Sequence, residues 1–151
     1  NNSVVPDYTE SQDVLDKDLI NIVLQEVENT KAHMKNLDSS KALASIFAMF
    51  AKANKYIEVT EPYRLAKDES QTARLHTVLR NLLEVIRIGT THLSAFLPDC
   101  SKTVLDILGV ETAIKENNFY NLEAGKQLDN CPMLFPRLDV AKELEELSKL
   151  S

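Results

Sequence analysis

The sequence has few of the residues that shape turns: glycine occurs 3 times and proline 5 times among 151 residues, and tryptophan does not occur. Because glycine supplies the positive φ angles of tight turns and phosphate-binding loops, its scarcity argues against a many-stranded sheet protein and against a glycine-rich nucleotide-binding loop. No apolar run approaches the roughly 18 residues of a membrane-spanning helix, so no membrane partner is expected. We expect a mostly helical, globular domain.

Cysteine is equally sparse, and no catalytic or metal-binding motif accompanies it. Cys100 and Cys131 form no C-x-x-C pair and have no histidine nearby, which indicates neither a zinc site nor a disulfide framework and favours a reducing, cytoplasmic compartment. His33, His76 and His92 form no helical pair of metal ligands. Since no nucleotide-binding or hydrolase motif occurs either, we expect no catalytic residue, no metal and no cofactor in this chain.

Acidic residues outnumber basic ones, 23 to 17, and the net charge of −6 argues against nucleic-acid binding by bulk charge. Between residues 52 and 87, however, seven basic residues meet only five acidic ones. This edge is a candidate for phosphate contacts, although Arg80, Glu84 and Arg87 also have the spacing of an ordinary surface ladder worth roughly a few tenths of a kcal/mol per pair. The candidate phosphate contacts are Lys52, Lys67, Arg74, Arg80 and Arg87.

Apolar residues recur at spacings of three and four, which is typical of helices with one buried face. The predicted helices span residues 11–37, 40–58, 70–97 and about 99–109. After a helical turn at 111–116, residues 117–138 have no periodicity and are expected to lie extended over the bundle, whereas residues 139–150 regain helical spacing. The predicted fold is all-α: an up-and-down helical bundle over residues 1–138, with an irregular C-terminal wrap, and a final short helix over residues 139–151.

The longest apolar stripes predict which helix faces point inward. In the second helix the stripe is Leu43, Phe47, Phe50, Asn54 and Ile57, and in the third it is Leu75, Leu79, Leu82, Ile86, Gly89, Leu93 and Phe96. Asn54 interrupts its stripe, and a buried asparagine commonly fixes the register between helices. Gly89 is expected to allow a close approach of another backbone.

The stretch from residue 58 to residue 70 breaks the helical pattern and predicts a tight bend. Pro62 can begin a short helical turn but cannot continue the preceding helix. Tyr63 follows directly, beside Arg64, and an exposed aromatic ring near guanidinium groups is what an unpaired nucleotide requires for binding. A tyrosine beside a proline also packs at the start of many helices, so both interpretations stay open.

Residues 54–98 have the sequence NKYIEVTEPYRLAKDESQTARLHTVLRNLLEVIRIGTTHLSAFLP. This segment closely resembles the anticodon-binding helical domain of bacterial methionyl-tRNA synthetases, in which N-K-Y-I, a P-W pair followed by L-A-K, and a long leucine-rich helix recur in this order. Residues 131–139, with the sequence CPMLFPRLD, are similar to the P-x-L-F-P-R-I-D stretch near the end of that domain. The resemblance extends from Val5 to Asp139.

The resemblance implies a bundle of the class I synthetase anticodon-binding type that binds the CAU anticodon loop of methionine tRNA. Joining methionine to the tRNA, with ATP and Mg²⁺, would belong to a separate catalytic domain whose motifs this chain lacks. Tyr63 stands where the family usually has a tryptophan that stacks on an anticodon base, and Pro62 would shape that platform. The predicted anticodon contacts are Pro62, Tyr63, Arg64 and Lys55.

The family's other base-recognising groups lie on a helix that would precede Asn1. We therefore expect an open apolar groove, covered in the isolated chain by a second copy or by the chain's own N-terminal arm. One alternative function is a helical protein-interaction module, which internal pairing of the basic edge and burial of Tyr63 would favour. Another is the anticodon-binding domain of a synthetase for valine, isoleucine, leucine or cysteine, against which the N-K-Y-I and L-F-P-R-L-D motifs argue.

Overall fold

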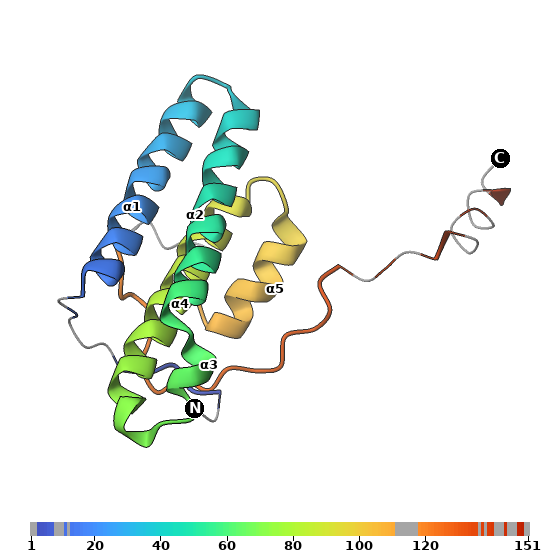
Figure 1. Ribbon diagram of the computed structural model, residues 1–151. Helices are drawn as coiled ribbons and strands as arrows, with labels where there is room; N and C mark the ends of the chain where they lie inside the picture. The colour runs from blue at the N-terminus through green and yellow to red at the C-terminus, as the bar shows by residue number, and fades with distance from the viewer. Residues whose placement is uncertain are drawn as a thin grey trace.

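The computed structural model describes residues 3–7, 11, 13–110, 118–135, 137, 139, 140, 144, 148 and 149. Helices dominate this part of the chain, and an isolated bridge between Val4 and Gln127 is its only β pairing. The elements are α1 (Val14–Lys35), α2 (Ser39–Thr60), α3 (Pro62–Leu65), the 3₁₀ turn η1 (Glu69–Gln71), α4 (Thr72–Leu93) and α5 (Pro98–Leu108), arranged as Figure 1 shows. The all-α prediction is confirmed, and four predicted helices correspond to α1, α2, α4 and α5.

Capping side chains determine where the first two helices begin. The Asp13 carboxylate accepts from the amide of Leu15 at 2.8 Å, and the Asp38 carboxylate accepts from the amide of Lys41 at 3.1 Å. These contacts satisfy backbone donors that have no partner inside the helix. Because Asp13 is the cap, α1 begins three residues later than the predicted residue 11. Gly109 ends α5 with a φ of 68°, a left-handed conformation that glycine adopts without strain.

The main core lies where α1, α2 and α4 meet, but it uses other helix faces than the stripes predicted. The buried residues of this core are Leu19, Val23, Val27, Met49, Ala53, Tyr56, Val78, Val85 and Ile88. The predicted stripe residue Phe47 is 53% exposed, Asn54 is exposed rather than buried, and Ile86 is 38% exposed. On α4 only Gly89 and Leu93 of the predicted stripe are buried, because most of the inward face carries polar side chains, which apolar periodicity does not count. On α2 a second stripe with the same spacing is buried instead, and it consists of Ala42, Ile46, Met49, Ala53 and Tyr56.

A second, smaller core joins the N-terminal segment, α5 and the wrap. It consists of Val5, Leu105, Leu108, Val110 and Leu122. The backbone of Val5 also pairs with the wrap, since its N–H donates to the carbonyl of Lys126 at 2.9 Å and its carbonyl accepts from Gly125 at 2.9 Å. The predicted extended wrap is thus present over residues 118–128. Residues 3–7 pack against it and do not line the groove described below, so this part of the N-terminal arm is not its cover.

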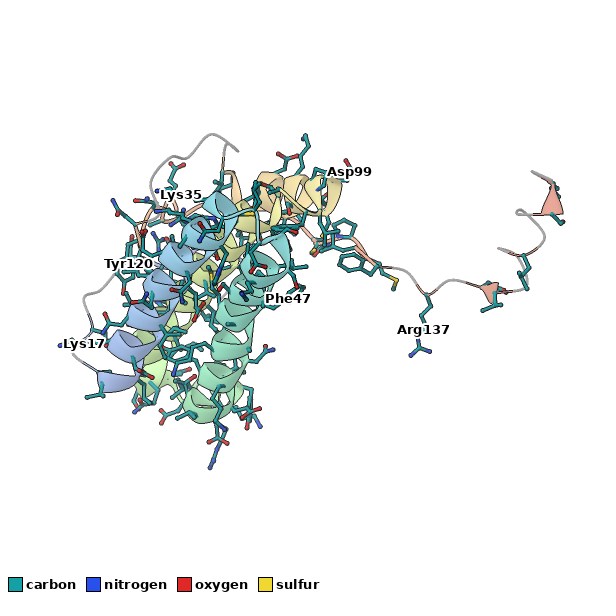
Figure 2. All side chains as sticks on the ribbon, turned by 90° about the horizontal axis from the view of Figure 1, so that it is seen from above. Lys17, Lys35, Phe47, Asp99, Tyr120 and Arg137 are labelled. Carbon is teal, nitrogen blue, oxygen red and sulfur yellow. The ribbon has the colours of Figure 1, made fainter. Side chains whose placement is uncertain are left out.

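The C-terminal segment leads away from the bundle. Arg137 stands on this segment well apart from the helices, as Figure 2 shows. Val140 and Leu144 are helical and 70% and 61% exposed, respectively. The other residues of the predicted helix over 139–150 lie largely outside the described residues, as does the predicted turn at 111–116. The division into 1–138 and 139–151 therefore stays a prediction.

Candidate nucleic-acid interface

A sharp bend joins α2 to α3 at the end of the bundle opposite the α1–α2 connection (Figure 1). At the bend, Glu61 has φ 44° and ψ 57°, a left-handed conformation that is uncommon for a residue other than glycine. Pro62 occupies the first turn of α3, where its missing N–H leaves no bond unmade. The following residue, Tyr63, is 59% exposed. The ring is therefore accessible to a ligand rather than packed as a helix-start contact.

A carboxylate holds the hydroxyl of this exposed tyrosine. The Tyr63 hydroxyl donates to Oε1 of Glu61 at 2.9 Å, while Nη1 of Arg64 donates to Oε2 of Glu61 at 2.7 Å. The bond from Tyr63, followed by that from Arg64, lowers the pKa of Glu61, and the same contact raises the pKa of Tyr63. The bend thus presents an accessible aromatic face whose rim carries one anion and one cation.

Three lysines predicted for this region differ in how far the protein engages them. Lys55 forms an exposed ion pair with Glu58 at 2.9 Å, and Lys67 is exposed. Lys52 is bound to Asp18 of α1, and its side chain is only 24% exposed. Exposed ion pairs contribute about 0–1 kcal/mol, so Lys55 can exchange its carboxylate for a phosphate at little cost.

Arg80 and Arg87 are buried, and their predicted role as phosphate contacts is therefore wrong. Their exposed fractions are 3% and 1%, and Glu84 between them is 0% exposed. Nε of Arg87 donates to Oε2 of Glu84 at 2.7 Å, and Nη2 of Arg80 lies 3.3 Å from Oε1 of the same carboxylate. The surface-ladder interpretation is wrong as well, because this ladder lies inside the protein. Helical spacing alone does not distinguish the two locations.

The buried cluster of Arg80, Glu84 and Arg87 fastens two extended segments to α4. Arg80 donates through Nη1 to the carbonyl of Pro6 at 3.0 Å and through Nη2 to the carbonyl of Leu122. The amide of Leu122 in turn donates to Glu84 at 2.8 Å. Arg87 donates through Nη2 to the carbonyl of residue 118 at 2.5 Å. These backbone carbonyls supply the acceptors that one carboxylate cannot provide for two guanidinium groups.

Arg74 is committed to a second internal network, so it too is not part of a phosphate-facing edge. Its Nη1 and Nη2 donate to Oδ2 and Oδ1 of Asp16 at 2.5 and 2.9 Å. The buried Tyr56 hydroxyl donates to Oδ1 of Asp16 at 2.5 Å and accepts from Nδ2 of Asn81 at 3.2 Å. This network ties α1, α2 and α4 together. The sequence analysis missed it, although the N-K-Y-I motif contains Tyr56.

Opposing effects set the ionisation of these buried groups. Burial acts to raise the pKa of Asp16, but hydrogen bonds from Arg74, Ser11 and Tyr56 outweigh it, and the resulting pKa is below the usual value. Burial, with the contact to Asp16, raises the pKa of Tyr56 well above its ordinary range. The carboxylate is therefore charged and the phenol neutral at pH 7, which is the pairing that the hydrogen bonds require.

An apolar groove of about 320 Å³ is lined by residues of α2 and α4. These residues are Phe50, Ala53, Asn54, Ile57, Leu79, Leu82, Leu83 and Ile86. Much of the lining comes from the stripes that the sequence predicted to be buried. The ring of Phe50, rather than a backbone, is the close neighbour of Gly89: a Cβ built on Gly89 would lie 2.6 Å from Cζ of Phe50.

Features of other functional classes are missing from the described part of the chain. No group of three or more histidine, cysteine, aspartate or glutamate residues there could hold a metal ion. Among the described helices, none is long and apolar enough to cross a membrane. Of the two observations that would favour a protein-interaction module, the internal pairing of the basic edge is partly met, but Tyr63 is not buried.

Comparison with known proteins agrees with the resemblance seen in the sequence. The family model described as "Anticodon binding domain of methionyl tRNA ligase" matches residues 5–149. The methionine–tRNA ligase of Caldanaerobacter subterraneus subsp. tengcongensis is 39% identical over 142 residues, which cover 92% of this chain and 22% of the relative. That of Clostridium acetobutylicum is 38% identical over 138 residues, covering 90% and 21%. The chain thus spans about a fifth of the length of these relatives.

Solved structures show the same fold. The apo form of Mycobacterium tuberculosis methionyl-tRNA synthetase superposes with a TM-score of 0.82 and 27% identity, over 91% of this chain and 28% of that one. The same synthetase bound by methionyl-adenylate gives a TM-score of 0.81 and 27% identity over 89% and 27%. Together with the family match over nearly the whole chain, these similarities disfavour both alternative functions. The chain belongs to the family of anticodon-binding domains of methionyl-tRNA ligases.

Proposed function

We propose that this chain binds the anticodon loop of methionine tRNA, as part of a ligase that joins methionine to that tRNA. The observation that carries the proposal is the exposed ring of Tyr63, at a bend near one end of a bundle of this family. Aromatic stacking on an unpaired base is worth roughly 1–3 kcal/mol and requires an accessible ring face. Pro62 begins the turn that presents the ring, and Arg64 brings positive charge to the same bend through its pair with Glu61. Lys55 lies in the last two turns of α2, where it is exposed and paired with Glu58.

The phosphate contacts in this proposal are fewer than the sequence suggested. Lys67 and Lys55 are exposed, whereas the side chain of Lys52 is only 24% exposed and is bound to Asp18. Such contacts fix the position of a nucleic acid without recognising its sequence. Recognition of methionine tRNA therefore depends, on this face, on the bases that reach the bend.

The chemistry of aminoacylation belongs, in this proposal, to the ligase's catalytic domain in the cytoplasm. That domain would use ATP and Mg²⁺ to activate methionine, in keeping with the methionyl-adenylate bound by the Mycobacterium tuberculosis synthetase. The anticodon-binding domain positions the tRNA for that reaction. It is also a partner of the catalytic domain within the same protein.

Replacing Tyr63 with alanine in the complete ligase tests this division of labour. Loss of one stacking contact, worth roughly 1–3 kcal/mol, predicts a fall in kcat/KM for tRNA aminoacylation of roughly 5- to 150-fold. The ATP–pyrophosphate exchange that reports methionine activation should be unchanged. Tyr63→Trp, which keeps and enlarges the ring face, is the matched control and should retain aminoacylation. Equal loss of both activities, or no loss of either, would contradict the proposal.

We also propose that the groove between α2 and α4 mediates self-association of the isolated chain. Support comes from its almost wholly apolar lining, together with Ile57 and Ile86, which are 37% and 38% exposed. A second copy would remove these side chains from water. Sedimentation velocity should show a concentration-dependent dimer that Leu79→Glu abolishes. A wild-type chain that stays monomeric at hundreds of micromolar would refute this second proposal while leaving the first intact.

A further inference from the structure

Glu61 combines an unusual backbone conformation with an unusual position for a carboxylate. Its left-handed φ of 44° is disfavoured for a side chain with a Cβ, and glycine would adopt it more easily. The side chain is 37% exposed, and it lies against the rim of the aromatic ring proposed to bind a base. A negative charge here works against binding of a phosphate backbone and suits a hydrogen-bond donor on a base instead.

The carboxylate has hydrogen-bonding capacity left over. An ionised carboxylate offers about four lone-pair positions on two oxygens. The hydroxyl of Tyr63 occupies one position on Oε1, and Nη1 of Arg64 occupies one on Oε2. Each oxygen can therefore accept a further bond, and the two existing bonds fix the orientation of the group. The anion is held in place rather than free to turn into solvent.

A base stacked on the Tyr63 ring would bring its edge close to the ring's rim, where Glu61 lies. Carboxylates accept hydrogen bonds from the N4 amino group of cytosine. Uracil has the same size but presents a carbonyl oxygen at the equivalent position, which would face the anion unfavourably. The position of Glu61 thus favours an amino group over a carbonyl on the bound pyrimidine.

We propose that Glu61 recognises the cytosine of the anticodon by accepting a hydrogen bond from its N4 amino group while the base stacks on Tyr63. This inference rests on the proposed function, since it requires an anticodon base at the bend. It assigns two separate tasks to neighbouring residues. The ring provides affinity for any base, and the carboxylate provides preference for cytosine over uracil.

The test measures the affinity of the complete ligase for two 17-nucleotide anticodon stem–loop RNAs that differ in one base, CAU and UAU. Glu61→Gly removes the carboxylate and suits the left-handed backbone, so it should preserve the bend. Glu61→Gln keeps the size of the side chain, but its amide can turn to donate to the uracil carbonyl. Both variants should reduce the CAU-to-UAU affinity ratio at least fivefold.

A matched control separates recognition from charge in general. Glu28, in the C-terminal half of α1, is an exposed carboxylate paired with Lys31. Glu28→Gln should leave the CAU-to-UAU affinity ratio unchanged. A purely structural role for Glu61 would lower the affinity for both RNAs by the same factor. A ratio that is unchanged in Glu61→Gly and Glu61→Gln would therefore overturn the inference.

Tyr63→Ala distinguishes failure of this inference from failure of the proposed function. If Tyr63→Ala weakens binding of both RNAs while the Glu61 variants leave the ratio intact, the ring binds a base and Glu61 does not recognise it. If Tyr63→Ala changes neither affinity, or if neither RNA binds the wild-type ligase, the proposed function and this inference fall together.

Discussion

Replacing Glu84 with glutamine should lower the free energy of unfolding far more than the loss of a surface ion pair with the same helical spacing would. The carboxylate is 0% exposed and is the counter-ion of two buried guanidinium groups. The amide of glutamine can still accept from Leu122, but it removes the only carboxylate that the described contacts place against Arg80 and Arg87. Breaking a buried ion pair in this way costs about 3–5 kcal/mol, because an uncompensated charge remains inside the protein.

The assay is urea unfolding of the isolated chain, followed by circular dichroism. The loss of about 3–5 kcal/mol corresponds to a fall in melting temperature of roughly 6–20 °C for a domain of this size. Asp106→Asn is the matched control, since the Lys102–Asp106 pair has the same i,i+4 spacing but side chains 69% and 60% exposed. That control should lose no more than about 1 kcal/mol. If Glu84→Gln and Asp106→Asn lose equally little, the buried-cluster account is refuted.

Three further predictions concern buried residues of α1, α2 and α4. Tyr56→Phe should lower the free energy of unfolding by about 1.5–3 kcal/mol in the same urea assay, because it removes a donor to the buried, charged Asp16. Folding lowers the pKa of Asp16, so the ionised Asp16 carboxylate stabilises the folded state above the unfolded pKa of about 3.9. This stabilisation is lost as the pH falls through the folded pKa. The urea midpoints at pH 6 and pH 3 should therefore differ less in Asp16→Asn than in the wild type. Gly89→Ala should lower the free energy of unfolding by about 1 kcal/mol, because crowding against Phe50 exceeds the gain in helix propensity. In a Phe50→Leu background the same substitution should lower it little or not at all. Equal losses in both backgrounds would contradict the crowding argument.

The positions of the helices could be predicted from the sequence, because apolar residues spaced three and four apart indicate any helix that has an apolar face. The same spacings did not identify the buried face of α2, because Ala42, Ile46, Met49, Ala53 and Tyr56 form a second stripe with the same spacing as the predicted one. They did not identify the buried face of α4 either. On α4 the inward positions include Arg80, Asn81, Glu84 and Arg87, and a count of apolar residues disregards them. Six residues of the predicted stripes instead line the groove: Phe50, Asn54, Ile57, Leu79, Leu82 and Ile86.

The candidate site was predictable to the extent that it depends on local sequence. The bend at Pro62 and the exposed ring of Tyr63 follow from the proline and its neighbours. The loss of Arg74, Arg80 and Arg87 as phosphate contacts depends on acceptors distant in sequence, among them Asp16 and the carbonyl of Leu122. Glu61 was also missed, because a carboxylate gives no sign in the sequence that a left-handed backbone will place it against a tyrosine.

The most direct test of base stacking at the bend is the NMR signal of the Tyr63 ring during titration with the CAU anticodon stem–loop. Ring-current shielding by a stacked base predicts an upfield shift of the Tyr63 ring protons that saturates with RNA, assigned by its absence in Tyr63→Phe spectra. The ring of Tyr56, which is 4% exposed in the core, should not shift. Saturable RNA binding that leaves the Tyr63 signal unmoved would contradict the account.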